Sequence, residues 1–212
     1  MDADHKFPCG LILLAAGAST RMGRPKQLLP VQGKPLLRHV VESVLTAPVS
    51  PVVVVLGANA TEIAPCLDGL PVQVVVNPGW SEGLASSLRI GMEALTAGAT
   101  TVESVVIALA DQPDFPAGHL EKLREVQAAT GRPIVASECA GVRGPPVLFT
   151  AGYFPALRAL RGDAGARALL QTHARDVATV PLAAARDLDT PADYAAYLNR
   201  LPPNNPELER GG

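Results

Sequence analysis

Two basic side chains and one carboxylate in this sequence suit chemistry on phosphate groups. Arg21 and Lys26 lie in a glycine-containing segment that directly follows a short apolar run. Exposed backbone N–H groups of such a loop form a concavity that binds anions, and the two cations add positive charge. Asp111 follows another apolar run, and Mg²⁺ prefers carboxylate and phosphate oxygens as ligands. These residues predict a site for a phosphate group and Mg²⁺, although an aspartate in this position also suits a simple turn.

The glycine-containing loop differs from the two best-known phosphate-binding loops. A P-loop requires G-x-x-x-x-G-K-[ST], but here five residues separate Gly17 from Gly23, and Arg24-Pro25 follows. A dinucleotide fingerprint requires G-x-G-x-x-G, which Ser19 interrupts at the second glycine. We therefore expect another kind of phosphate cradle, in which Gly17 and Gly23 reach positive φ and let the backbone approach a ligand.

Residues 11–26 resemble the L-A-[AG]-G-x-[SG]-x-R-M-G-x-x-K signature of the nucleotidyltransferases. Within the MobA-like group they look most like the molybdenum cofactor cytidylyltransferases, which carry L-A-A-G-x-S-x-R-M-G-x-P-K. The resemblance implies that Arg21, Lys26 and Asp111 are catalytic, with the cations on the triphosphate and Asp111 on Mg²⁺. It also implies nucleotide contacts from Leu14, Ala15, Ala16 and Gly17. Ala16 favours CTP, because guanylyltransferases of this group usually have L-A-G-G, but sugar nucleotidyltransferases also carry L-A-A-G.

A second segment with family resemblance begins at Asn77. It is similar to N-x-x-W-x-x-G-x-x-x-S-[LI], which closes over the base and ribose, and this implies nucleotide contacts from Asn77, Gly83 and Ser86. A plain helix start explains the same pattern, since Ser86 falls in the first turn of a predicted helix. Trp80 suits either packing near the site or ordinary packing.

A third segment contains Asp189 in the pattern D-L-D-T-P-x-D-Y. Thr190 suits a helix N-cap, Pro191 the first helical position and Asp193 the return bond of a capping box. These structural roles leave Asp189 free, and the resemblance implies that it is the second metal carboxylate, with Asp187 as the alternative.

The resemblance also extends to a region that would hold the acceptor. The segments G-x-P-x-x-[FL] and G-D-x-G-A-R imply acceptor-binding roles for Gly144, Asp163 and Arg167. A helix N-terminus with a nearby arginine is a natural phosphate site, where the phosphate of a pterin substrate could dock. Asp163 equally suits a helix N-cap.

Strand-like and helix-like segments alternate along the chain, and they must position these residues. Apolar runs predict strands at 11–16, 51–56, 72–76, 104–110, 133–137, 147–149 and 177–182, whereas 3.6-residue periodicity predicts helices at 35–45, 61–67, 84–95, 117–129, 153–160, 164–173 and 191–198. Residues 141–146, rich in glycine and proline, predict a turn. The βαβα order favours a three-layer α/β/α, Rossmann-like nucleotidyltransferase fold with a mostly parallel sheet. Ligands of such sheets bind beyond the carboxyl ends of the strands, where the loops after residues 16, 76 and 110 would meet.

Length and composition suit one α/β domain. The chain has 212 residues, of which 48% are hydrophobic and 4% aromatic, so the core must be mainly aliphatic. We expect a single domain over residues 1–200, with a nucleotide-binding half at about 10–115 and an acceptor-binding half at about 116–200. Residues 201–212 are polar and proline-rich, which predicts a disordered tail.

Charge, cysteines and histidines exclude several other classes. A net charge of −2 gives no support for nucleic-acid or membrane partners, and no apolar run is long enough to cross a bilayer. Three cysteines without C-x-x-C spacing and an N-terminus unlike a secretory signal predict reduced thiols in a cytoplasmic protein. The four histidines lack metal-ligand spacing, and no G-x-S-x-G elbow is present.

The resemblance therefore implies a Mg²⁺-dependent enzyme that transfers CMP from CTP to the terminal phosphate of molybdopterin and releases pyrophosphate. CTP and molybdopterin would be its substrates, and a molybdoenzyme or its chaperone would receive the product. Three alternatives stay open. They are a nucleotidyltransferase acting with GTP or on a sugar phosphate, a non-catalytic carrier of the molybdenum cofactor, and an NAD(P)H-dependent oxidoreductase of the same group. The missing G-x-G-x-x-G argues against a standard nicotinamide site.

Overall fold

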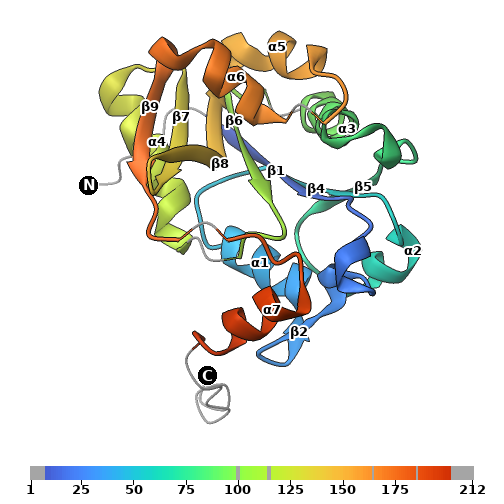
Figure 1. Cartoon of the computed structure of the whole chain (residues 1–212). Coiled ribbons are helices and arrows are strands. Elements are labelled where there is room, and N and C mark those ends of the chain that lie inside the picture. Colours follow the sequence, from blue (N-terminus) through green and yellow to red (C-terminus); the bar gives the residue numbers. More distant parts are fainter. Residues whose placement is uncertain (1–7, 99–100, 114–115, 164, 185, 202–212) are drawn as a thin grey trace.

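A seven-stranded sheet forms the centre of the computed structural model, which describes residues 8–98, 101–113, 116–163, 165–184 and 186–201 (Figure 1). In spatial order the strands are β5 (Gln73–Val76), β4 (Val52–Leu56), β1 (Cys9–Ala15), β6 (Ser104–Leu109), β8 (Val142–Thr150), β7 (Ile134–Cys139) and β9 (Val177–Pro181). β8 runs antiparallel to β6 and β7, whereas the other neighbouring pairs of this sheet are parallel. The predicted mostly parallel sheet is confirmed.

Two apolar clusters on opposite faces of the sheet give the molecule three layers. Successive residues of a strand point to opposite faces, and β1 shows this directly. Leu11 and Leu13 belong to one cluster, and Ile12 and Leu14 belong to the other. Because both faces of β1 are covered, the whole strand is buried. This explains why it is an unbroken apolar run instead of an alternating one.

Helices supply the outer layers (Figure 1). The first cluster contains side chains of α1 (Leu36–Val44), α4 (Ala117–Thr130), α7 (Pro191–Leu198) and the short α2 (Ala60–Ile63). The second contains side chains of α3 (Leu84–Ala97), α5 (Phe154–Ala159) and α6 (Ala166–Thr172). The predicted three-layer α/β/α fold is therefore confirmed. None of the described helices is long and apolar enough to cross a membrane.

Two local expectations need correction. Residues 141–146 are not only a turn, because β8 already begins at Val142. The pairing of β7 with β8 shifts register between Ala136 and Ser137, an irregularity that accommodates prolines, which cannot donate to a sheet ladder. The predicted helix at 61–67 is α2 followed by a separate 3-10 turn, Ala64–Leu67, because Pro65 cannot continue an α-helix.

A small hairpin, β2 (Pro30–Val31) and β3 (Lys34–Pro35), was not predicted, since each strand has only two residues. Of the disordered tail predicted at 201–212, residues 202–212 lie outside the described residues.

Candidate active site

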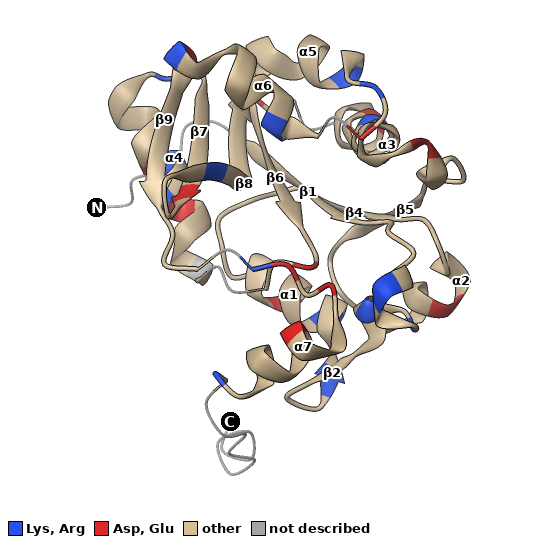
Figure 2. Cartoon of the chain, viewed as in Figure 1, with Lys and Arg blue, Asp and Glu red and all other residues tan. Residues whose placement is uncertain are grey.

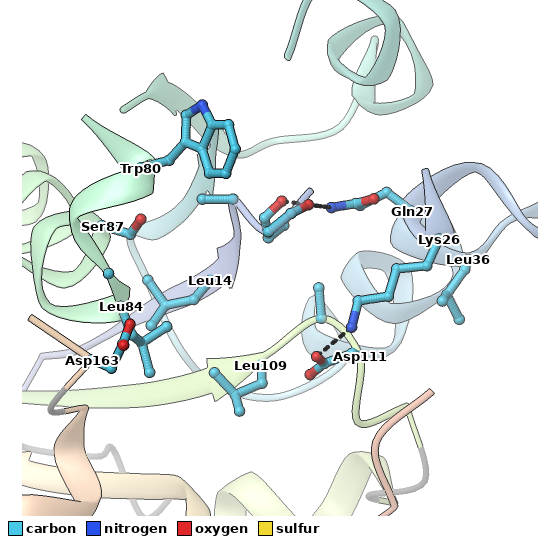
Figure 3. Close-up of a pocket in the computed structure, with 15 residues that line it drawn as sticks. Leu14, Lys26, Gln27, Leu36, Trp80, Leu84, Ser87, Leu109, Asp111 and Asp163 are labelled. Atoms are coloured by element: carbon cyan, nitrogen blue, oxygen red, sulfur yellow. Dashed lines mark hydrogen bonds and ion pairs between the residues drawn. The ribbon is translucent and has the colours of Figure 1, made fainter. Parts of the chain in front are cut away.

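A pocket of about 340 Å³ opens beyond the carboxyl ends of β1 and β6 (Figure 3). Its walls come from the loop after β1, the start of α3, the end of β6 and the segment before α6. The residues that line it are Leu14, Ala15, Ala16, Gly17, Lys26, Gln27, Leu36, Trp80, Gly83, Leu84, Ser87, Leu109, Ala110, Asp111 and Asp163. The structure thus brings most of the first motif, Gly83 and Asp111 around one cavity, at the edge of the sheet where the strand order predicts ligands.

The Gln27 side chain holds the loop after β1 in place through hydrogen bonds. Its buried amide donates hydrogen bonds to the Ala15 carbonyl at 2.8 Å and the Gly17 carbonyl at 3.1 Å. The Ser19 hydroxyl, 3.3 Å from the Gln27 Oε1, accepts a bond from the Lys26 backbone N–H at 3.1 Å. These bonds fold the loop back on itself and place the Lys26 side chain at the pocket.

Only one of the two glycines of this loop, Gly23, has the expected positive φ. Gly23 does have a positive φ of 71°, and Ser19 has one of 56°, but Gly17 is not in the left-handed region. A Cβ at Gly17 would meet nothing within 4 Å. Neither the backbone conformation nor the packing of the protein itself thus requires glycine there. Gly17 keeps one wall of the pocket free of a side chain, as a closely approaching ligand needs.

Four charged side chains form an ion-pair cluster at the other end of the pocket. The Nζ of Lys26 lies 2.6 Å from Asp111 Oδ2 and 3.0 Å from Asp189 Oδ1. The guanidinium of Arg21 lies 2.7 Å from Asp189 Oδ2, with its side chain 70% exposed. Figure 2 shows acidic positions of the segment after β6 and of the segment leading into α7 side by side. Lys26 therefore contacts a carboxylate that lies 163 positions away from it in the sequence.

Backbone and packing contacts bring Asp189 to this place. The Leu188 N–H donates to the Asp111 carbonyl at 2.9 Å, and the Leu188 side chain is buried in the core. Directly after Asp189, Thr190 caps α7, and Asp193 completes the predicted capping box. Asp189 is thus held between a buried anchor and a capped helix, with its carboxylate free to face Lys26.

Burial and charge set the pKa values in the cluster. Burial raises the pKa of the Asp111 carboxyl, attraction to Lys26 offsets only part of this, and Asp187 and Asp189 add to the rise. Burial by itself would lower the pKa of Lys26, but the two carboxylates outweigh it and the pKa is raised overall. Lys26 therefore stays charged at neutral pH.

The carboxylates fit the requirements of a magnesium ion. The Oδ1 atom of Asp111 is buried and accepts no hydrogen bond from the described residues, although buried polar atoms are almost always partnered. No group of three or more His, Cys, Asp or Glu side chains within the described ranges could hold a metal by itself. One or two carboxylates completed by substrate phosphates and water are a common ligand set of Mg²⁺.

The wall opposite Lys26 is built by a neutral hydrogen-bond network. Asn77 is buried and donates to the hydroxyls of Ser86 at 2.8 Å and Ser87 at 3.0 Å. Its Oδ1 accepts a bond from the Gly79 N–H, and the Ser86 hydroxyl donates to the Gly83 carbonyl at 2.8 Å. Asn77 and Ser86 do not line the pocket, whereas Ser87 and Trp80 do. Direct nucleotide contacts from Asn77 and Ser86 stay a prediction, since the structure shows them holding the loop.

The three predicted acceptor-binding residues are divided between two cavities. Asp163 lines the first pocket, whereas Gly144 and Arg167 line a second cavity of about 370 Å³. The second cavity borders the ion-pair cluster through Gln112 and Asp187, whose side chains are joined by a 2.7 Å hydrogen bond. Asp163 is not a helix N-cap, because α6 begins after Gly165.

Sequence reasoning missed six residues of the first pocket: Gln27, Leu36, Leu84, Ser87, Leu109 and Ala110. Gln27 offered one signal, because it is a polar residue directly after the motif lysine and before a predicted helix. The leucines gave none, since their positions equally suit the core.

Comparison with known proteins identifies the family of the chain. Residues 11–177 match the MobA-like NTP transferase domain. The chain is 37% identical to nicotine blue oxidoreductase of Paenarthrobacter nicotinovorans over 178 residues, which cover 79% of this chain and 84% of that protein. It is 31% identical to the purine catabolism protein PucB of Bacillus subtilis over 196 residues, 86% of this chain and 92% of the relative.

A solved structure, Rv0371c of Mycobacterium tuberculosis H37Rv, superposes with a TM-score of 0.78 at 28% identity. The superposed region covers 92% of this chain and 100% of the Rv0371c chain. Rv0371c has also been solved in complex with manganese. The chain described above belongs to the MobA-like NTP transferase family and is an enzyme of the nucleotidyltransferase class.

Proposed function

We propose that this protein is a Mg²⁺-dependent cytidylyltransferase that transfers CMP from CTP to the terminal phosphate of molybdopterin, in the cytoplasm. The observation that carries the proposal is the contact of Lys26 with both Asp111 and Asp189, next to the unpartnered Oδ1 of Asp111. A cation for the triphosphate and two carboxylates for Mg²⁺ are thus within reach of one nucleotide-sized pocket. The manganese complex of Rv0371c supports a divalent cation in this fold.

The reaction forms a bond between an acceptor phosphate oxygen and the α-phosphorus of CTP and breaks the bond between that phosphorus and the β-phosphate. Lys26 and Arg21 bind the phosphates and stabilise the negative charge of the leaving pyrophosphate. Asp111 and Asp189 would hold Mg²⁺, which when bound neutralises charge on the triphosphate and polarises the α-phosphate. The acceptor phosphate is already ionised near neutral pH, so no side chain needs to act as a base.

The second cavity is the proposed place of the acceptor. It adjoins the cluster through Gln112, which directly follows Asp111, and through Asp187, which lies two residues before Asp189. Arg167 has no ion-pair or hydrogen-bond partner within the part of the chain that the structure describes, so it is available to an anionic group. The Oε1 of Gln112 is buried without a donor there, and a pterin ring carries N–H donors that could satisfy it.

Pyrophosphate release tests the proposal. The purified protein is incubated with Mg²⁺ and molybdopterin, and release is compared for CTP, GTP and ATP, with mixtures lacking the acceptor as controls. We expect release with CTP and acceptor together and none with CTP alone. Preference for GTP would overturn the use of Ala16 as a CTP signal, and release with a sugar phosphate instead of molybdopterin would overturn the acceptor. A protein that binds the molybdenum cofactor without releasing pyrophosphate would be a carrier.

A second candidate function is suggested by one relative. At 37% identity, the chain resembles a protein named nicotine blue oxidoreductase, and such an enzyme transfers reducing equivalents. NADPH or NADH is therefore added to the same protein, and binding is followed by quenching of Trp80 fluorescence. We expect no quenching at concentrations where CTP with Mg²⁺ gives it. Tight NADPH binding would favour the oxidoreductase.

A further inference from the structure

Asp163 is a charged residue of the nucleotide pocket to which the proposed reaction gives no task. Lys26 and Asp111, the other charged residues that line the pocket, are paired with each other. The Asp163 carboxylate has no hydrogen-bond or ion-pair partner within residues 8–201 as far as they are described. Figure 3 shows it beside Leu84, on the side of the pocket away from Lys26 and Asp111. The pocket thus has an available carboxylate opposite its phosphate-binding end.

Two hydrogen bonds and one close backbone approach hold the segment that carries Asp163 against the beginning of α3. The Ala85 N–H donates to the Gly162 carbonyl at 3.0 Å, and Arg89 donates to the Leu160 carbonyl at 3.2 Å. At Gly83, where φ is 107°, a Cβ would lie 2.5 Å from the Gly162 carbonyl and 2.6 Å from Asp163 Oδ1. This close approach, possible only with glycine, sets the carboxylate against the start of α3.

The chemistry of a carboxylate limits what it can bind here. An ionised carboxylate only accepts hydrogen bonds, and its negative charge repels phosphates, so the triphosphate must lie at the Lys26 end. The ligand part that reaches Asp163 must therefore be a neutral donor. Asp163 is exposed, which suits a solvated sugar at the pocket mouth better than a base edge, whose recognition depends on desolvation. Two adjacent hydroxyls match the two carboxylate oxygens.

We propose that Asp163 accepts hydrogen bonds from the 2′- and 3′-hydroxyls of the nucleotide ribose and makes the enzyme select ribonucleotides over deoxyribonucleotides. This inference rests on the proposed function only in that the pocket binds a nucleoside triphosphate. The acceptor role that the sequence implied for Asp163 is replaced by a role in nucleotide specificity.

Calorimetric binding of CTP and 2′-deoxy-CTP to the whole chain with Mg²⁺ tests the inference. A hydrogen bond to a charged group is worth about tenfold or more in affinity. The wild type should therefore bind CTP about tenfold more tightly than 2′-deoxy-CTP. Asp163→Ala should bind the two nucleotides equally, and Asp163→Asn should lie between them. Asp68→Ala, at an exposed aspartate that does not line this pocket, should keep the wild-type ratio.

Four outcomes would contradict the inference. Equal binding of CTP and 2′-deoxy-CTP by the wild type overturns the ribose contact alone, because nucleotide binding itself persists. An unchanged ratio of the CTP and 2′-deoxy-CTP affinities in Asp163→Asn also overturns the ribose contact alone. This variant keeps the shape of the side chain, and its melting temperature shows whether it is folded. If Asp163→Ala instead loses discrimination between CTP and UTP, the contact is to the base amino group. Absence of any nucleotide binding by the wild type overturns the proposed function and this inference together.

Discussion

The two walls of the nucleotide pocket satisfy their polar groups in different ways. On one wall, Lys26 contacts Asp111 and Asp189, and the Oδ1 of Asp111 is left without a partner. On the other, Asn77 bonds to Ser86, Ser87 and the Gly79 N–H. The first wall has capacity left for a ligand, whereas the side chains of the Asn77 network on the second wall are engaged with one another.

This difference indicates that the charged wall serves ligand binding and catalysis, whereas the neutral wall serves the stability of the fold. An unpartnered buried acceptor costs the folded protein free energy and marks a place where a ligand can be bound. A closed network contributes to stability, and breaking it leaves buried groups unsatisfied. Variants of the charged wall should therefore lose activity while they stay folded, and variants of the neutral wall should lose stability first.

The largest effect is expected for Asp111→Asn. It removes one of the two proposed metal carboxylates and should lower the rate of pyrophosphate release about a thousandfold, since a metal contributes several kcal/mol to the transition state. Its melting temperature without metal should be no lower than that of the wild type, because Lys26 keeps Asp189 as a partner. Asp68→Asn is the matched control and should leave the rate unchanged. A variant with full activity would exclude Asp111 from catalysis.

Lys26→Met should lower the rate about a hundredfold, as the loss of one charge-stabilising group typically does. Although Lys26→Met should lower the rate, it should strengthen the binding of a metal ion. Without nucleotide, the Lys26 ammonium competes with a cation for both carboxylates, so Mn²⁺ should bind the variant about tenfold more tightly than the wild type. Titration with Mn²⁺ alone, followed by the electron paramagnetic resonance of the free ion, measures this.

Lys34→Met is the control for this experiment, because Lys34 pairs with Glu42 outside the pocket. It should change neither the rate nor the affinity for Mn²⁺. Weaker Mn²⁺ binding by Lys26→Met would show that the lysine supports the carboxylates instead of competing with the ion.

The difference between the walls also explains how much the sequence could predict. Apolar runs predicted the layered sheet, and the first motif predicted that Ala16, Gly17 and Lys26 meet Asp111, because parallel strands bring their carboxyl ends to one edge. Which of Ser86 and Ser87 faces the pocket depends on the rotation of α3, which the packing of its apolar side chains in the core sets. The position of Asp163 likewise depends on the contact between Gly83 and Gly162, which no spacing in the chain reveals.

Asn77→Ala should act on stability. It removes three hydrogen bonds of a buried side chain, and the free energy of unfolding should fall by about 1–3 kcal/mol. Urea denaturation measures this loss, and Ser81→Ala, at an exposed neighbouring position, should be close to the wild type. At temperatures where the variant is folded, its turnover number should stay within a few fold of the wild type. A stable but inactive variant would instead make Asn77 a direct nucleotide ligand.

The smallest effect is a pH dependence of stability that belongs to the charged wall alone. Burial raises the pKa of Asp111 in the folded protein above its ordinary value of 3.8, which applies to the unfolded chain. At pH values between the unfolded and the folded pKa, the folded protein therefore keeps a proton that the unfolded chain has lost. Stability contributed by this group therefore falls as pH rises through that window and stays low above it. Urea unfolding in the presence of EDTA should show this fall for the wild type and not for Asp111→Asn, whose amide does not titrate. Asn77→Ala should keep the wild-type slope despite its lower stability. If the stability difference between the wild type and Asp111→Asn instead grows in favour of the wild type as pH rises, then attraction to Lys26 outweighs burial. Asp111 would then be an ordinary ion-pair partner, and its unpartnered oxygen would no longer mark a metal site.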